Sequence, residues 1–332
     1  MTEMSSSSSA SPEVVGTDGW GRRFPELRWE IDSAALPAVG TAAGVGLLST
    51  AVVMAAMYAR DQGSLDASTF TGGVLAVIGL LGIAVAAHLL VADAERRASL
   101  ISWPGAAGAG GLGVLLTVLM DQRHGALYAG PILTLAAVAL GFLLTRGPAF
   151  LLVGIAALAV LYGKLFDDVI NPDGDGGNTY MAIGAAVVVF VVLVTLAGWM
   201  LPETRVLTGV VTGAGGLAGM AMILQFLQLS RFYTSSVFGE GSGVEAKSPY
   251  TNDIWAILGY CALLALFWAA CALGTGHVGF RVLVIVVSVI AVPMAAYALV
   301  VHHPSWWEVV IGGVGGVLLL AVGALVRRPA VQ

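Results

Sequence analysis

Charge is scarce in this chain. Only 11% of the 332 residues are charged, whereas soluble domains carry roughly 25%. Hydrophobic residues make up 58% of the chain, more than the interior of a soluble fold of this length can hide. The composition therefore predicts an integral membrane protein whose partner is the lipid bilayer. The formal net charge of −5 is spread out without a basic patch, which excludes nucleic acid as a partner.

Cysteine is almost absent as well. Cys261 and Cys271 lie in one apolar run, ten residues apart, which places them about 15 Å apart on a helix. That separation is too large for a disulfide, and the chain has no CxxC motif. We expect both side chains to be small buried apolar groups.

The motifs of common enzymes are also missing. The chain contains no P-loop, nucleophile elbow or HExxH sequence. The acidic turn at 171–178 begins like a calcium loop, but Ala182 stands where the bidentate glutamate belongs. We therefore predict no catalytic residue and no cofactor. Ionisable residues are nearly absent from the middle of the apolar runs, which disfavours a proton-coupled pump but not facilitated transport of apolar cargo.

Long apolar runs are what the chain has in abundance. A helix that crosses a membrane needs roughly 20 mostly apolar residues. An all-α polytopic transmembrane bundle of about ten spanning helices is therefore predicted over residues 34–328, after a disordered tail over residues 1–33. The predicted spans are 36–59, 70–92, 100–120, 126–145, 148–166, 179–200, 206–229, 253–273, 278–301 and 306–326.

Lysine and arginine predict the orientation of the bundle. With the N-terminus inside, ten of the fifteen basic residues fall in inner segments. Both termini are therefore predicted to be cytoplasmic, with the chain in the plasma membrane. The outer connections collect acids, among them Asp167, Asp168 and Asp253. The two longer connections, 166–178 and 230–253, fall outside, and the first divides the chain into two groups of five helices, an arrangement typical of many carriers.

Glycines at helical spacing mark close contacts between helices. Glycine lets two backbones approach closely, and such packing drives helix association in lipid. These positions predict either intramolecular helix packing or a face for a partner protein or a second copy of the chain. They are Gly209, Gly213, Gly215, Gly219, Gly312 and Gly316.

Three polar residues near the ends of apolar runs are candidates for lining a pathway. Lys164 lies near the end of the fifth run, where its long side chain can reach the membrane surface. Gln225 and Gln228 are three residues apart, so they share one face of the seventh helix.

The stretch HHPSWW allows two interpretations. His302 and His303 are predicted to lie on the same side of the membrane as His124, and three histidines can ligate a metal ion or haem iron. Alternatively the stretch is a turn at the membrane surface, with its tryptophan rings at the level of the lipid headgroups.

The sequence leaves three functions open. The first is a non-catalytic accessory, scaffold or assembly component that works with a protein partner, as the scarcity of buried charge and the glycine-rich faces suggest. The second is a carrier or permease for a small or lipid-like molecule, as the ten-helix count and the division into halves suggest. The third is an outer-face metal or haem-handling protein that uses the three histidines.

Overall fold

The computed structural model describes residues 36–61, 64–120, 125–170, 179–201, 204–238 and 250–299, together with 308–309, 311–317 and 319–320. The chain divides into two units, residues 1–41 and residues 42–332. The second unit contains nearly all the described residues. The predicted N-terminal tail lies outside the described residues.

Within the described residues, nine helices are long and apolar enough to cross a membrane. A two-residue antiparallel pair, β1 (Arg60–Asp61) and β2 (Ser64–Leu65), joins the first two. Residues 311–317 are also helical, inside the tenth predicted run. The predicted all-α polytopic transmembrane bundle is thus confirmed. The nine helices are α1 (Leu36–Tyr58), α2 (Ala67–Leu90), α3 (Ala94–Leu119), α4 (Ala126–Thr145), α5 (Pro148–Ile170), α6 (Thr179–Gly198), α7 (Arg205–Phe238), α8 (Thr251–Thr275) and α9 (Val278–Leu299).

Three helix ends differ from the prediction by four residues or more. Helix α5 continues to Ile170, beyond its predicted end at residue 166. The segment 230–238 was expected to belong to a connection, but it continues α7, because it contains no glycine or proline to stop a helix. Helix α3 begins at Ala94, six residues before the predicted start, because the polar residues 95–97 are good helix formers. The end of an apolar run therefore predicts where a helix leaves the lipid, but it does not predict where the helix itself ends.

Local chemistry fixes two other ends. The carboxylate of Asp66 accepts hydrogen bonds from the backbone N–H of Ser68 and from the hydroxyls of Ser68 and Thr69, so it caps the start of α2. The hydrogen bonds from Thr69 and Ser68 hold the pKa of Asp66 below its usual value. Gly276 ends α8 in the left-handed conformation, with φ of +68°, which glycine adopts without strain.

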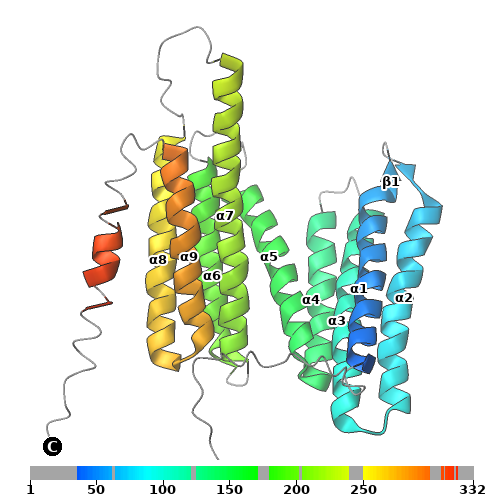
Figure 1. Ribbon diagram of the computed structural model, residues 1–332. Helices are drawn as coiled ribbons and strands as arrows, with labels where there is room; N and C mark the ends of the chain where they lie inside the picture. Colours follow the sequence, from blue (N-terminus) through cyan, green and yellow to red (C-terminus); the bar gives the residue numbers. More distant parts are fainter. Residues whose placement is uncertain are drawn as a thin grey trace, which may run out of the picture. The chain divides into compact units, whose positions relative to one another are not determined.

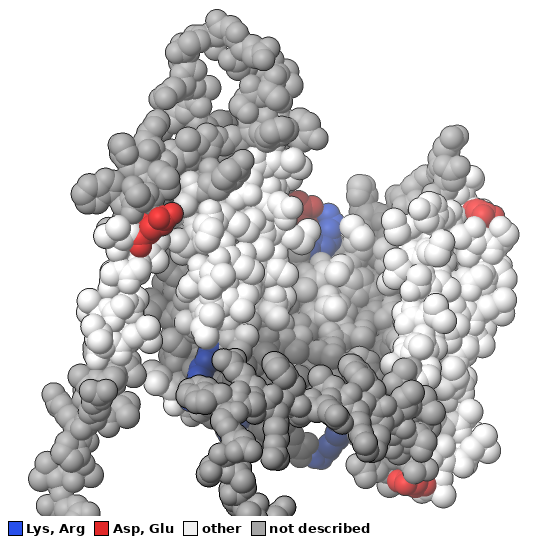
Figure 2. Space-filling model, in the orientation of Figure 1, with Lys and Arg blue, Asp and Glu red and all other residues white. Residues whose placement is uncertain are grey.

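Contacts divide the second unit into two groups of helices. In the first group, α2 packs on α3, α3 on α4 and α4 on α5. In the second, α6, α7, α8 and α9 lie side by side (Figure 1). Helix α5 also contacts α6 and α7, but less extensively than it contacts α4. On the face shown in Figure 2, the charged atoms of described residues lie towards the two ends of the helices, with uncharged surface between them.

The first group packs mainly through small residues. At the α3–α4 crossing, a Cβ atom added at Gly113 would lie 2.5 Å from the Gly130 carbonyl oxygen, and one added at Gly130 would lie 2.5 Å from the Gly113 carbonyl oxygen. The hydroxyls of Thr117 and Thr134 donate to these two carbonyl groups over 3.0 and 3.1 Å, each within its own helix. The two backbones are in direct contact, because small residues allow membrane helices to approach each other closely.

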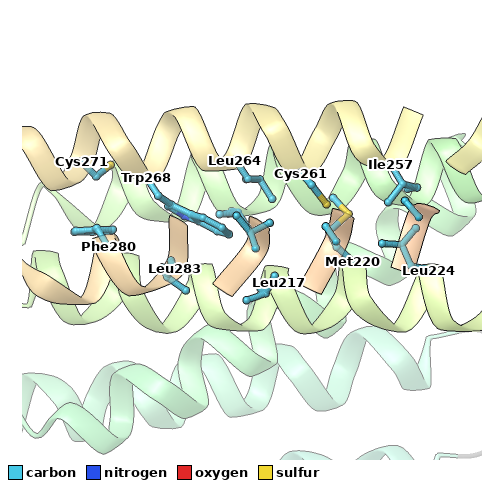
Figure 3. Packing of buried hydrophobic residues seen from close by; sticks show 14 of the residues in the cluster. Leu217, Met220, Leu224, Ile257, Cys261, Leu264, Trp268, Cys271, Phe280 and Leu283 are labelled. Carbon is cyan, nitrogen blue, oxygen red and sulfur yellow. The ribbon is translucent and has the colours of Figure 1, made fainter. Parts of the chain in front are cut away.

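The second group packs through large side chains. Figure 3 shows Trp268 of α8 among Leu264, Phe280 and Leu283, all of them buried. Cys261 and Cys271 belong to the same cluster and are free thiols, as the sequence predicts. The two groups therefore differ in their interiors, because the buried residues of the first group are mainly small ones such as alanine and glycine.

Candidate functional site

A cavity of about 580 Å³ is lined by residues of α5, α6 and α7. Its volume lies within the range of roughly 300–1,000 Å³ that is typical of sites for small molecules. Along α5 the lining runs from Leu152 to Asp167, a rise of about 22 Å. The cavity is therefore elongated along the helices, and it lies where the two helix groups meet.

Most of the wall is apolar. A Cβ atom added at Gly215 of α7 would have no other atom within 4 Å, so this glycine leaves part of the cavity empty. The neighbouring Gly216 is different, because a Cβ there would collide with Val191 of α6. Tyr162 of α5 and Phe190 of α6 line the cavity and touch each other, with ring centroids 5.4 Å apart.

Thr212 brings a buried hydroxyl to this apolar wall. The residue is 2% exposed, and its Oγ has no hydrogen-bond partner within the described part of the chain. Threonines in helices commonly donate to the carbonyl group four residues earlier, as Thr208 does to Thr204 over 3.0 Å. A buried hydroxyl without a partner costs about 1–3 kcal/mol. Thr212 is thus a cavity-lining residue whose buried hydroxyl has no hydrogen-bond partner among the described residues.

Charged residues stand at the other end of the cavity. Asp167 lines the cavity and is paired with Lys164, whose Nζ lies 3.3 Å from its Oδ2. Lys164 also pairs with Oδ1 of Asp168, and the Tyr128 hydroxyl donates to Oδ2 of Asp168 over 2.7 Å. The sequence predicts Lys164 as polar lining, whereas the cavity itself reaches Asp167, which was expected only as a loop acid.

The two glutamines lie elsewhere. Gln228 donates from Nε2 to the carbonyl oxygen of Met294 over 2.6 Å, which ties α7 to α9. Gln225 is exposed. Neither is among the residues that line the cavity of α5, α6 and α7.

The six predicted glycines have different surroundings. A Cβ at Gly209 would meet Phe280, one at Gly213 would meet Leu283 and Trp268, and one at Gly219 would only touch Val187 at 3.7 Å. Gly215 faces the cavity. Gly312 and Gly316 are exposed, with no atom within 4 Å of an added Cβ, and a partner face there stays a prediction.

The histidine site lies outside the described residues, since His124, His302 and His303 all fall there. The same holds for the acidic turn at 171–178. A metal or haem site on these residues therefore stays a prediction.

Asp253 is a buried carboxylate at the start of α8. It was counted with the acids of the outer connections and as the first residue of the predicted span 253–273, and in the structure it is the third residue of α8 and is 2% exposed. Neither oxygen of the carboxylate has a hydrogen-bond partner among the described residues. The signal in the sequence is the helical spacing of Asp253 with Ile257, which is fully buried.

A second cavity of about 450 Å³ is lined by residues of α1, α3, α4 and α5. Pro131 lies on its wall and removes the backbone donor that would otherwise bond the Leu127 carbonyl group. Ala156 of α5 lines both this cavity and the larger one. Helix α5 is therefore the common wall of two cavities.

Replacing Thr212 with valine tests whether the hydroxyl serves a ligand. Thr212→Val keeps the shape of the side chain and removes an unpaired buried polar group. In ligand-free detergent the free energy of unfolding is expected to rise by about 1–2 kcal/mol. A loss of stability, measured by reversible unfolding, would show instead that the hydroxyl already has a structural partner.

Known proteins give no further guide to this cavity. Comparison of the chain with protein families, curated proteins and solved structures finds no match.

Proposed function

We propose that the chain is a carrier that binds an elongated, mostly apolar amphiphile in the cavity of α5, α6 and α7. The observation that carries the proposal is the unpaired buried hydroxyl of Thr212 in a wall that is otherwise largely apolar. Ligand sites combine such apolar walls with a few well-placed polar groups. The ligand would place its chain along α5 and a hydrogen-bonding group near Thr212.

The position of the cavity favours a carrier over a scaffold. Carriers bind cargo where two helix groups meet and move against each other. The cavity lies at such a place, and the contacts of α5 with α6 and α7 are less extensive than those inside either group. The scaffold alternative depends on a partner face, for which the exposed Gly312 and Gly316 are the best candidates.

The proposed setting is the plasma membrane, with both termini cytoplasmic. The bias of basic residues supports this orientation. In it, the Asp167 end of the cavity faces outwards and the Thr212 end lies deeper. Amphiphiles would then enter or leave at the Asp167 end, with the headgroup pointing out of the membrane.

Filling the cavity is expected to abolish ligand binding. Gly215→Phe adds a ring where an added Cβ meets nothing within 4 Å, so the side chain occupies cavity space rather than displacing neighbours. We expect lipid that co-purifies with the protein to fall at least about tenfold, because the ring removes the space for a chain. Native mass spectrometry of the purified protein, followed by lipid extraction, measures this loss.

The matched control is Gly259→Phe. Gly259 of α8 is exposed, and an added Cβ there also meets nothing within 4 Å, but the residue does not line the cavity. This variant is expected to retain its bound lipid. Equal lipid content in both variants and the parent would contradict the carrier proposal, because the lipid would then be an ordinary annular layer.

A further inference from the structure

The cavity also shows which headgroup it would accept. Building on the proposed function, we infer that the site selects amphiphiles with an ammonium headgroup, of the kind carried by choline lipids, over anionic amphiphiles. The inference depends on three features of the Asp167 end. They are the exposed carboxylate of Asp167, the oxygen of that carboxylate that accepts no hydrogen bond within the described residues, and a set of aromatic rings.

Two carboxylates share one ammonium group at this end of the cavity. Within the described residues, Lys164 pairs with both Asp167 and Asp168. Asp168 has both oxygens engaged, one by Lys164 and the other by the Tyr128 hydroxyl. Asp167 has the looser pairing of the two, because among the described residues its Oδ2 has only the 3.3 Å contact with Lys164.

Asp167 is accessible to a ligand. Its side chain is 62% exposed, and the residue lines the cavity. Within the described structure its Oδ1 keeps free acceptor capacity. An ammonium group at this position would gain an opposite charge, while a phosphate or sulfate without a compensating cation would be repelled.

Aromatic rings below the carboxylate favour the same headgroup. Phe166, Tyr162 and Phe190 line this cavity, and the first two lie within five residues of Asp167 on α5. The faces of aromatic rings attract quaternary ammonium ions. The Tyr162–Phe190 contact, at 5.4 Å between centroids, brings rings from two helices together on the wall.

The other end of the cavity supplies an independent indication of a ligand. Thr212 is only 2% exposed and is unpaired among the described residues, and it lines the same cavity. A ligand that begins at Asp167 and follows the apolar wall would reach this hydroxyl with its distal part. The cavity therefore offers a charge at one end, a hydrogen-bonding group at the other and an apolar passage between.

Binding of two lysolipids with the same acyl chain tests the inference. Lysophosphatidylcholine and lysophosphatidylglycerol are titrated into the full-length protein in lipid nanodiscs, with native mass spectrometry as the readout. The parent protein is expected to prefer the choline lipid by about tenfold, which corresponds to 1.4 kcal/mol. Asp167→Asn is expected to reduce this preference to about twofold while leaving the affinity for uncharged monoacylglycerol unchanged.

Two further variants separate charge from folding. Glu308→Gln removes the same charge from an exposed residue away from the cavity and is expected to keep the tenfold preference. Tyr162→Leu keeps an apolar wall but removes a ring face. We expect it to weaken the binding of the choline lipid about fivefold, with little effect on the binding of the anionic lipid.

The possible failures are distinguishable. Equal affinities for the two lysolipids in the parent protein, or an unchanged preference in Asp167→Asn, would overturn the headgroup assignment while leaving the carrier proposal in place. Displacement of the bound lipid by free choline at equal concentration would overturn the assignment to a chain-bearing molecule. Absence of any lysolipid binding, together with equal lipid content in Gly215→Phe and the parent, would overturn the carrier proposal itself.

Discussion

Gly113→Ala is expected to lower the free energy of unfolding by about 3–5 kcal/mol. The added methyl group would lie 2.5 Å from the carbonyl oxygen of Gly130 and even closer to the hydroxyl of Thr134. A backbone atom cannot rotate away, so α3 and α4 must separate along the crossing and lose their packing contacts. Reversible unfolding in mixed micelles, or steric trapping in a bilayer, measures the change.

The control for this prediction is Gly82→Ala on α2. Gly82 is exposed, and an added Cβ meets nothing within 4 Å, so this change is expected to be neutral or to stabilise the helix by up to about 1 kcal/mol. The double variant Gly113→Ala with Thr134→Ala is expected to recover only part of the loss, because the Gly130 carbonyl stays in the way. A full recovery would show that the side chain alone sets the crossing distance.

Phe150→Ala is expected to cost about 3–5 kcal/mol as well. The ring of Phe150 is 4% exposed and fills a slot between glycines of two other helices. A Cβ added at Gly105 of α3 would lie 2.9 Å from its Cζ, and one at Gly141 of α4 would lie 2.7 Å from its Cδ1. No side chain at either glycine can move into the space that the ring leaves, so a cavity remains at the junction of three helices.

The same unfolding measurement includes a control and a compensating change. Leu143→Ala, at a residue that is 78% exposed, is expected to change stability by less than about 0.5 kcal/mol. Gly141→Leu is expected to destabilise the parent protein but to restore part of the stability of Phe150→Ala by refilling the slot. Additive effects of the two changes would contradict the direct contact.

The class of fold could be predicted because lipid imposes one requirement. Without water to satisfy the backbone, each long apolar run must be a helix, and nine of the predicted runs are spanning helices in the described structure. The helix ends were harder, because α3 and α7 continue through polar residues that remain compatible with a helix. The burial of Asp253 was not predicted, because it depends on how α8 packs against its neighbours.

The cavity was harder to predict from the sequence than the fold. Thr212 lies three residues before Gly215, so it shares a face with a glycine that was singled out for packing. The available signal was Thr212, a polar residue on a helix face made of small residues. Such a residue indicates a cavity only when the positions of the neighbouring helices are known. Asp167 was visible as an acid, but its place at the end of a cavity depends on α6 and α7, which are remote in sequence.

The contrast between the two helix groups affects how the protein can move. Glycine and alanine lose no rotamer freedom when they are buried, whereas each leucine, methionine or aromatic residue must be fixed in one rotamer. The first group, α2 to α5, therefore has few buried side chains besides Phe150 that must be refitted when its helices shift. The α6–α9 group, organised around Trp268 and Phe280, can shift only by repacking its interior. Any transition of this protein is expected to leave the second group rigid and to be accommodated where α5 contacts α6 and α7, because these contacts are the less extensive ones.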